Sequence, residues 1–150
     1  MPTYVGTPPP LRGSRVSAFV NIMEGCNYFC TFCVVPYTRG RERSRPVADV
    51  LAEVEDLLYR GYREVTLLGQ TVNAYGKSLR PRTTFAALLR QIDALAGGEI
   101  RIRFTSPHPR EVTPDLYAAM AECRGVCEHA HLPVQSGSDR VLTRMRRLYT

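Results

Sequence analysis

The chain has 150 residues, enough for one modest domain with a hydrophobic core. Hydrophobic residues make up 44% of the sequence, so we expect a folded protein rather than a disordered one. No apolar run approaches the roughly 20 residues of a membrane span, and no signal-peptide pattern opens the chain, so we expect a cytoplasmic protein without a membrane partner. The net charge of +6 fits a polyanionic partner such as RNA, and it fits equally well a charge that serves solubility alone.

The sequence opens with a tail and then alternates between strand and helix patterns. Residues 1–15 are rich in Pro, Gly and Thr and are typical of a linker. We expect strands at residues 16–22, 64–68, 100–104 and 129–134. The first of these is apolar enough to be buried on both faces. We expect helices after Pro46, across residues 85–95, after Thr113 and after Ser138.

Four strand–helix units in succession predict an α/β fold with parallel strands and right-handed crossovers. The short segments leave two architectures open, a doubly wound open sheet or part of a barrel. In both, the loops at the carboxyl ends of the strands carry the chemistry. The loops expected there span residues 23–43, 69–71, 106–109 and 135–138.

Three of the five cysteines lie in the first of these loops with the spacing Cys-x-x-x-Cys-x-x-Cys, at Cys26, Cys30 and Cys33. Thiolates in a reducing compartment favour iron–sulfur clusters or zinc. A structural zinc site normally has four ligands, whereas this loop offers three. A [4Fe–4S] cluster held by three thiolates keeps one iron open, and that iron can chelate S-adenosylmethionine (SAM) for radical chemistry. The pattern therefore favours a SAM-binding cluster and leaves a zinc site as the alternative.

Four segments of the chain resemble a known family. Residues 25–46, which include the three cysteines, resemble the core of the radical-SAM methylthiotransferases, and the resemblance continues through residues 67–76, 103–109 and 131–139. Within that family the chain is most similar to the MiaB type, which adds a methylthio group to C2 of N6-isopentenyladenosine beside the anticodon of tRNA. The resemblance implies a partial (β/α) barrel of the radical-SAM type, with a [4Fe–4S] cluster and SAM as cofactors. It also implies tRNA, an electron donor and a sulfur source as partners.

The resemblance further implies roles for individual residues. The three cysteines match the cluster ligands, and no other catalytic residue is assigned. The residues expected to contact SAM or substrate are Phe32, Gly69, Gln70, Ser106, Gln135 and Ser136. Phe32 either stacks on the adenine of SAM or packs against its own loop, and ordinary turn chemistry is the alternative for the other five. The candidates for contact with RNA phosphates are Arg39, Arg41, Arg43 and Arg45, which could equally form a solvated charge run.

The chain departs from the family at both ends. The family's N-terminal domain, with three further cysteines for a second cluster, and its C-terminal RNA-binding domain have no counterpart in this sequence. We therefore expect residues 16–150 to form an incomplete radical-SAM core. Three alternative functions stay open: modification of another tRNA adenosine, modification of a protein side chain, and a zinc- and RNA-binding module without catalysis. Cys123 and Cys127 are expected to be structural or incidental.

Overall fold

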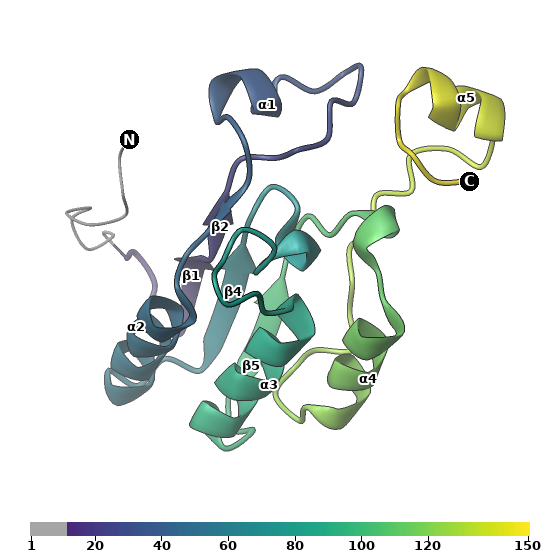
Figure 1. Cartoon of the computed structure of the whole chain (residues 1–150). Helices are drawn as coiled ribbons and strands as arrows, with labels where there is room; N and C mark the ends of the chain where they lie inside the picture. The colour runs from purple at the N-terminus through teal and green to yellow at the C-terminus, as the bar shows by residue number, and fades with distance from the viewer. Residues whose placement is uncertain (1–11) are drawn as a thin grey trace.

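The computed structural model describes residues 12–150, and a three-stranded parallel sheet lies at its centre (Figure 1). The strands, in their order across the sheet, are β1 (Ser17–Asn21), β4 (Glu64–Leu68) and β5 (Arg101–Phe104). Their parallel pairing confirms the predicted α/β class. Most of the linker predicted at residues 1–15 lies outside the described residues.

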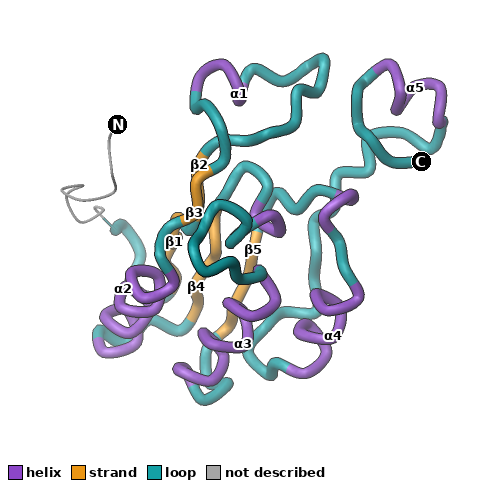
Figure 2. The backbone as a smooth tube through the Cα atoms, viewed as in Figure 1, coloured by secondary structure: helices purple, strands orange, loops and turns teal. Residues whose placement is uncertain are grey.

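Three helices, one after each strand, cover one face of the sheet (Figures 1 and 2). They are α2 (Val47–Tyr59), α3 (Phe85–Ala96) and α4 (Pro114–Glu122). The strand side chains on this face are almost completely buried: Ala18, Val20, Val65, Leu67, Ile102 and Phe104. Burial of a large apolar side chain contributes about 1.5–3 kcal/mol, so this face holds most of the stability of the fold.

Local sequence signals determine where these helices begin and end. The hydroxyl of Thr84 accepts a hydrogen bond of 3.0 Å from the amide of Ala87 at the start of α3. Thr113 caps α4 in the same way, with a bond of 3.2 Å from the amide of Leu116. Gly97 ends α3 with a φ of +61°, a conformation that favours glycine. These caps confirm the predicted starts of both helices and the predicted end of α3.

The opposite face of the sheet has no helix over it in the part of the chain that the structure describes (Figure 1). Phe19 of β1 is 66% exposed on this face, where Thr66 and Arg103 follow it in register. Glu64 accepts a hydrogen bond of 3.1 Å from Arg103 and pairs with Arg101 at 3.6 Å. The prediction that the first strand is buried on both faces is therefore wrong, because helices cover only one face.

The fourth strand predicted at residues 129–134 does not form. After α4 the chain pairs with β5 as an isolated bridge at Val126, where the amide of Cys127 donates to the carbonyl of Ile102 at 3.0 Å. Residues 129–134 then continue without regular structure. Pro133 has no N–H to add to a sheet, which disfavours pairing there. A parallel segment does follow α4, but it is shorter and earlier in the chain than predicted.

The remaining elements lie in the loops at the carboxyl ends of the strands. They are β2 (Met23–Glu24), β3 (Arg43–Ser44), α1 (Val35–Thr38), α5 (Asp139–Arg144) and the 3₁₀ turns η1 (Val72–Ala74) and η2 (Pro109–Glu111). The loop predicted at residues 23–43 is thus confirmed, with only short elements inside it. Figure 1 shows α1 and α5 beyond the same end of the sheet. No described helix has the length and apolar character that a membrane crossing requires.

Candidate cofactor site at the cysteine loop

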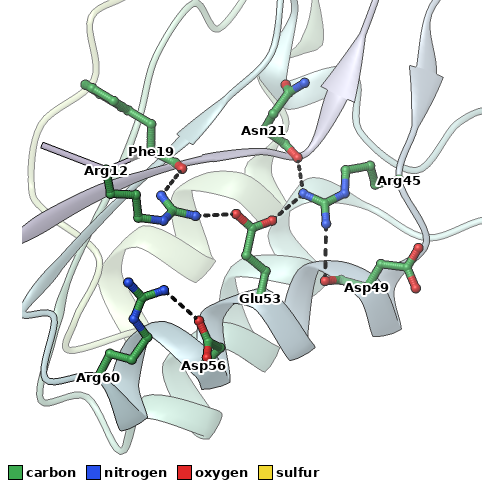
Figure 3. Close-up of polar contacts among 8 residues, drawn as sticks. All are labelled: Arg12, Phe19, Asn21, Arg45, Asp49, Glu53, Asp56 and Arg60. Carbon is green, nitrogen blue, oxygen red and sulfur yellow. Dashed lines mark hydrogen bonds and ion pairs between the residues drawn. The ribbon is translucent and has the colours of Figure 1, made fainter. Parts of the chain in front are cut away.

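Residues 22–44, which we call the cysteine loop, leave β1 and return to α2, and ion pairs hold the base of this loop (Figure 3). Arg45 donates to the carbonyl of Asn21 at 2.7 Å and to a carboxylate oxygen of Glu53 at 2.6 Å. Arg12 donates to the other oxygen of Glu53 at 2.6 Å. None of the three charged side chains is more than 21% exposed. The network therefore ties the end of β1 and the return of the loop to helix α2.

Two of the four arginines proposed for RNA contact are already engaged. Arg45 is used in the base of the loop and its side chain is only 15% exposed, which disfavours the prediction that it contacts RNA. Arg43 pairs with Glu24 at 3.7 Å across the short β2–β3 hairpin. Arg39 and Arg41 are exposed, as contact with phosphate requires.

A sharp turn at Gly25 brings the two sides of the loop together directly before the first cysteine. Its φ is +75°, and a Cβ at this position would lie 2.2 Å from the carbonyl oxygen of Arg41, so only glycine fits. The amide of Cys26 then donates to the carbonyl of Gly40 at 3.1 Å. From the loop after β4, Oε1 of Gln70 accepts a hydrogen bond of 2.6 Å from the amide of Gly25. Gln70, predicted as a site residue, thus contacts the cysteine loop.

Hydrogen-bonding groups from three segments surround the sulfurs of the first two cysteines. Cys26 is buried, and its Sγ accepts a hydrogen bond of 3.4 Å from the amide of Tyr28 and lies 3.2 Å from the hydroxyl of Thr71. Cys30 is also buried, and its Sγ accepts a hydrogen bond of 3.4 Å from Nη1 of Arg147. Hydrogen bonds of this kind stabilise a thiolate, which is the form of cysteine that binds metals.

The third cysteine brings the thiols of the loop to three, the number that a [4Fe–4S] cluster with one open iron requires. The side chain of Cys33 is half-buried, and its amide donates to the carbonyl of Cys30 at 3.0 Å. Within residues 12–150, no three Cys, His, Asp or Glu side chains stand close enough to share one metal ion. In a cubane cluster each thiolate binds a different iron, so the ligands stand farther apart than those of one zinc ion. The loop thus supplies three thiols, two of which accept hydrogen bonds at their sulfurs, and this donor set fits an iron–sulfur cluster.

Three of the four aromatic side chains of the cysteine loop are largely exposed. Phe32 is 56% exposed, so much of its ring is available to a ligand. Phe29 and Tyr37 are 51% and 77% exposed, and their rings meet edge to face with 5.7 Å between centroids. The exposure of Phe32 favours the prediction that it stacks on adenine over packing against its own loop.

Behind the cysteine loop, aromatic rings from distant segments meet at His108. Its ring stacks on Tyr28 with 4.2 Å between centroids and meets Tyr149 edge-on at 5.5 Å. The side chain of Asn73 holds the backbone of His108, accepting from its amide at 2.8 Å and donating to its carbonyl at 2.9 Å. Burial and the nearby cation of Arg147 lower the pKa of His108 from 6.5 to about 4. The imidazole is therefore neutral at neutral pH.

The neutral ring of His108 has a defined tautomer. Its Nδ1 accepts a hydrogen bond of 3.2 Å from the amide of Arg110, so the proton is on Nε2. This Nε2 atom is buried and finds no hydrogen-bond partner among residues 12–150. His108 thus has one buried N–H group that a ligand or a water molecule can use.

A carboxylate on η2 completes the connection between the loop after β5 and the cysteine loop. Glu111 accepts a hydrogen bond from the hydroxyl of Tyr28 and forms an ion pair with Lys77. Burial acts to raise the pKa of Glu111, but the hydrogen bonds from Lys77 and Tyr28 outweigh it and hold the pKa below its usual range. Burial and the bond to Glu111 raise the pKa of Tyr28. The phenol therefore stays protonated and keeps donating at neutral pH.

Two other predicted residues lie at the ends of β4 and β5. Gly69 permits a close approach, because a Cβ there would lie 2.6 Å from Cγ of Met23 at the start of the cysteine loop. Ser106 has a φ of +58°, and its carbonyl accepts a hydrogen bond of 3.4 Å from the amide of Val72. Both residues thus help to bring neighbouring loops together.

Gln135 and Ser136 lie in the segment that leads to α5. Gln135 is exposed and has a φ of +69°. The amide of Ser136 donates to the carbonyl of Val134 at 2.8 Å, and the hydroxyl of Ser136 accepts a hydrogen bond from the amide of Ser138 at 3.1 Å. Among the described residues, no hydrogen bond joins Gln135 or Ser136 to the cysteine loop. The contacts that they do make are those of ordinary turns.

Sequence reasoning assigned no role to Thr71 and Arg147, which contact cysteine sulfurs, or to His108, which stacks on Tyr28 of the cysteine loop. Thr71 directly follows Gln70, and His108 belongs to the segment 103–109 that carries the family resemblance, so both stood beside a usable signal. Arg147 is 117 positions away from Cys30, and no spacing rule connects them.

The other two cysteines lie at the opposite end of the sheet. Cys123 and Cys127 line an open cavity of about 720 Å³ together with residues at the amino ends of the strands, among them Arg63 and Ile100. Burial and the nearby carboxylate of Asp93 raise the pKa of Cys123, which favours the neutral thiol. The environment of Cys123 is in line with the prediction that it is structural or incidental.

The family model of the Radical SAM superfamily matches residues 20–150. The chain belongs to this superfamily. Its fold is similar to that of TsrM from Kitasatospora setae, a radical S-adenosylmethionine methyltransferase solved with cobalamin and a [4Fe–4S] cluster bound. The TM-score is 0.66 at 20% sequence identity, and the match covers 83% of this chain and 23% of the TsrM chain. A TsrM structure with tryptophan and a SAM analogue bound gives a TM-score of 0.67 at 19% identity, over 85% of this chain and 24% of that one. Superfamily membership confirms the predicted radical-SAM fold and the predicted cofactors, a [4Fe–4S] cluster and SAM.

Closer relatives carry the methylthiotransferase name that the resemblance predicted. The chain is 54% identical over 141 residues to a tRNA-2-methylthio-N(6)-dimethylallyladenosine synthase from Clostridium tetani. The aligned region covers 94% of this chain and 31% of the relative. It is 56% identical over 139 residues to the synthase of the same name from Clostridium beijerinckii, covering 93% of this chain and 30% of the relative. The chain therefore spans about a third of the length of the curated relatives that it matches.

Proposed function

We propose that this chain is the SAM-radical part of a tRNA methylthiotransferase that adds a methylthio group to C2 of N6-dimethylallyladenosine, also called N6-isopentenyladenosine. The observation that carries the proposal is 54% and 56% identity to two synthases of that name over more than nine-tenths of the chain. Because the chain spans about a third of those relatives, the proposed role is one part of the whole reaction.

In this proposal Cys26, Cys30 and Cys33 bind three irons of the cluster and leave the fourth iron to SAM. The bound cluster supplies the electron that cleaves SAM and produces a carbon radical. Two residues fix the shape of the loop. Gly25 makes the turn before the first ligand, and the side chain of Gln70 accepts a hydrogen bond of 2.6 Å from the amide of Gly25. The sulfurs of Cys26 and Cys30 accept hydrogen bonds from the amide of Tyr28 and the guanidinium of Arg147.

Positions for SAM follow from the same geometry. The exposed ring of Phe32 offers a stacking surface for adenine. The backbone at Gly69 lies against the start of the cysteine loop, where a side chain would collide with Met23. Ser106, Gln135 and Ser136 belong to the loops around this site and are proposed to contact SAM or substrate.

The proposed partners are tRNA, an electron donor and a sulfur source, and the proposed location is the cytoplasm. Exposed Arg39 and Arg41 follow the third cysteine, so phosphate groups bound there would lie on the loop that holds the cluster. The +6 net charge supports a polyanionic substrate without identifying it.

The test is anaerobic reconstitution of the protein expressed with all coding sequence in frame with this chain. We expect about four iron and four sulfide per chain, and release of 5′-deoxyadenosine from SAM on reduction. With tRNA containing N6-dimethylallyladenosine and a sulfur source, mass spectrometry of the nucleosides should detect the methylthio product. A matched tRNA lacking the dimethylallyl group is the control.

Three results would contradict the proposal. Tight zinc binding without SAM cleavage would indicate a zinc- and RNA-binding module. SAM cleavage with methylthiolation of a protein side chain, but not of tRNA, would indicate the protein-modifying alternative. Equal activity on the control tRNA would indicate a different adenosine as the substrate.

A further inference from the structure

Arg147 is a buried cation with an unusual set of partners. Its side chain lies in the segment after α5, and the residue is only 5% exposed. All three of its nitrogens donate: Nε to the hydroxyl of Tyr149 at 3.0 Å, Nη2 to the carbonyl of Pro133 at 3.0 Å, and Nη1 to Sγ of Cys30 at 3.4 Å. Three donors in use fix the orientation of the planar guanidinium.

The charge of Arg147 is not neutralised by any carboxylate. No ion pair among residues 12–150 includes it, and its oxygen partners are a carbonyl and a phenol. The phenol of Tyr149 donates onward to the carbonyl of Val134 at 2.8 Å. A buried cation without a counter-charge is costly. The one partner that can become an anion is the sulfur of Cys30.

As a cluster ligand, Cys30 would be a thiolate, and its sulfur would then supply the missing counter-charge. A neutral thiol is a weak acceptor. A thiolate accepts strongly and carries the negative charge that would balance the cation of Arg147. The contacts at the other buried cysteine differ, since Cys26 meets a backbone amide and a hydroxyl. Among the contacts at the two buried sulfurs, Arg147 therefore provides the formal charge.

We propose that Arg147 raises the reduction potential of the cluster by stabilising the added negative charge through the thiolate of Cys30. This inference rests on the proposed function, because it takes Cys30 as a cluster ligand. Reduction adds one electron from an external one-electron donor and makes the cluster one unit more negative. A fixed cation and a hydrogen bond at a ligand sulfur favour the more negative state, so they shift the potential upward.

The test measures the potential rather than the activity. The protein, expressed with all coding sequence in frame with this chain, is reconstituted and its cluster is titrated with reductant under electron paramagnetic resonance detection. In Arg147→Gln we expect the ratio of reduced to oxidised cluster at a fixed potential to fall about tenfold, which equals about 59 mV for a one-electron couple. Arg147→Lys, which keeps the charge, should fall between this variant and the unmodified protein.

Arg144→Gln is the matched control, because Arg144 is an exposed arginine of α5 and is three positions away. Its ratio should equal that of the unmodified protein. An Arg147→Gln protein that carries its cluster with the same potential as the control would overturn the inference and leave the proposed function intact. An unmodified protein that forms no [4Fe–4S] cluster would overturn both.

A second measurement decides the matter if Arg147→Gln loses the cluster altogether. The unmodified protein is labelled with ¹⁵N-arginine, and the electron spin echo of its reduced cluster is recorded. We expect a ¹⁵N coupling that disappears in Arg147→Lys, since lysine cannot contribute the labelled nitrogen. A spectrum without that coupling in the unmodified protein would contradict a guanidinium at the cluster sulfur.

Discussion

Buried cysteines lie at both ends of the same sheet, and the groups around them differ in charge. At the carboxyl end, Cys30 is 7% exposed and its sulfur accepts a hydrogen bond from a guanidinium. At the amino end, Cys123 is also 7% exposed, but burial and the carboxylate of Asp93 both raise its pKa. Burial alone therefore does not distinguish a metal-ligating cysteine from a core cysteine. The sign of the neighbouring charge does.

The loops explain why the two ends differ. At the carboxyl end the donors come from residues far from the cysteine loop in sequence, such as Arg147, and the parallel topology brings their segments together. At the amino end the carboxylate of Asp93 is already used locally, accepting a hydrogen bond of 2.7 Å from the amide of Gly125. That bond orients the turn between α4 and the bridge at Val126, which is a structural role.

The largest effect expected from this comparison is loss of the cluster in Cys30→Ser. A serine hydroxyl is a harder ligand than a thiolate and stays protonated at neutral pH, so one iron loses its ligand. We expect bound iron after reconstitution to fall from about four per chain to near zero, with loss of 5′-deoxyadenosine formation. Iron and sulfide analysis together with visible absorbance measure this directly.

Cys127→Ser is the matched change at the other end of the sheet. Cys127 is half-buried, and its backbone bond to Ile102 does not depend on the side chain. Iron content should therefore be unchanged. Equal loss of iron in Cys30→Ser and Cys127→Ser would contradict the different roles that we infer for the cysteines at the two ends of the sheet.

The next largest effect concerns arginines at the two ends. Arg45→Met removes the guanidinium that joins Asn21 to Glu53, and breaking a mostly buried ion pair should lower the free energy of unfolding by about 3 kcal/mol. Arg63→Met at the amino end removes an exposed side chain, and it should change the free energy of unfolding by less than about 0.5 kcal/mol. Urea unfolding followed by circular dichroism compares them. If Arg45→Met instead weakened RNA binding at unchanged stability, Arg45 would be an RNA contact after all.

Local signals explain the parts of the fold that the sequence predicted well. Strand β4 is bounded as predicted at residues 64–68, and α3 ends at Gly97 because glycine accepts the left-handed conformation there. The strand predicted at residues 129–134 failed for a different reason. Its apolar residues suggested burial, but pairing with β5 depends on which residue the chain presents first after α4, and that residue is Val126. Register is a property of packing rather than of local pattern.

The site was predictable only where its residues are close in sequence. The cysteine spacing predicts Cys26, Cys30 and Cys33 as ligands, and adjacency to a strand end pointed to Gln70, which does contact the loop. Arg147 carried no such signal, because its partner sulfur is 117 positions away. Whether an arginine is exposed or buried also decided the RNA candidates, and only the structure distinguishes Arg45 from Arg41 in this respect.

A smaller effect should separate a buried histidine from an exposed one by pH. His108 is protonated near pH 6.5 when unfolded but only near pH 4 when folded. Between these values the unfolded chain binds more protons, so the free energy of unfolding falls as the pH falls. We expect about 2 kcal/mol of stability to be lost between pH 7 and pH 4.5 through this residue. Urea unfolding at both pH values measures the loss.

His108→Phe keeps a ring that can stack on Tyr28 and removes the titrating group, so its loss of stability over this range should be about 2 kcal/mol smaller. His131→Phe is the control, because His131 is exposed and its replacement should leave the pH dependence unchanged. A His108→Phe protein with the same pH dependence as the control would show that other groups cause the acid sensitivity.

The smallest effect concerns Thr71, whose hydroxyl lies 3.2 Å from the sulfur of Cys26. Thr71→Val removes this neutral dipole while keeping a side chain of similar size, and a neutral hydrogen bond contributes only about 1 kcal/mol. The cluster should still form, but the ratio of reduced to oxidised cluster at a fixed potential should fall by about threefold, less than for Arg147→Gln. Thr71→Ser, which restores the hydroxyl, should recover the ratio. If Thr71→Val and Thr71→Ser gave the same ratio of reduced to oxidised cluster, the hydroxyl would have no effect on the cluster. The contrast between the two ends of the sheet would then depend on the charge of Arg147 rather than on the full set of donors.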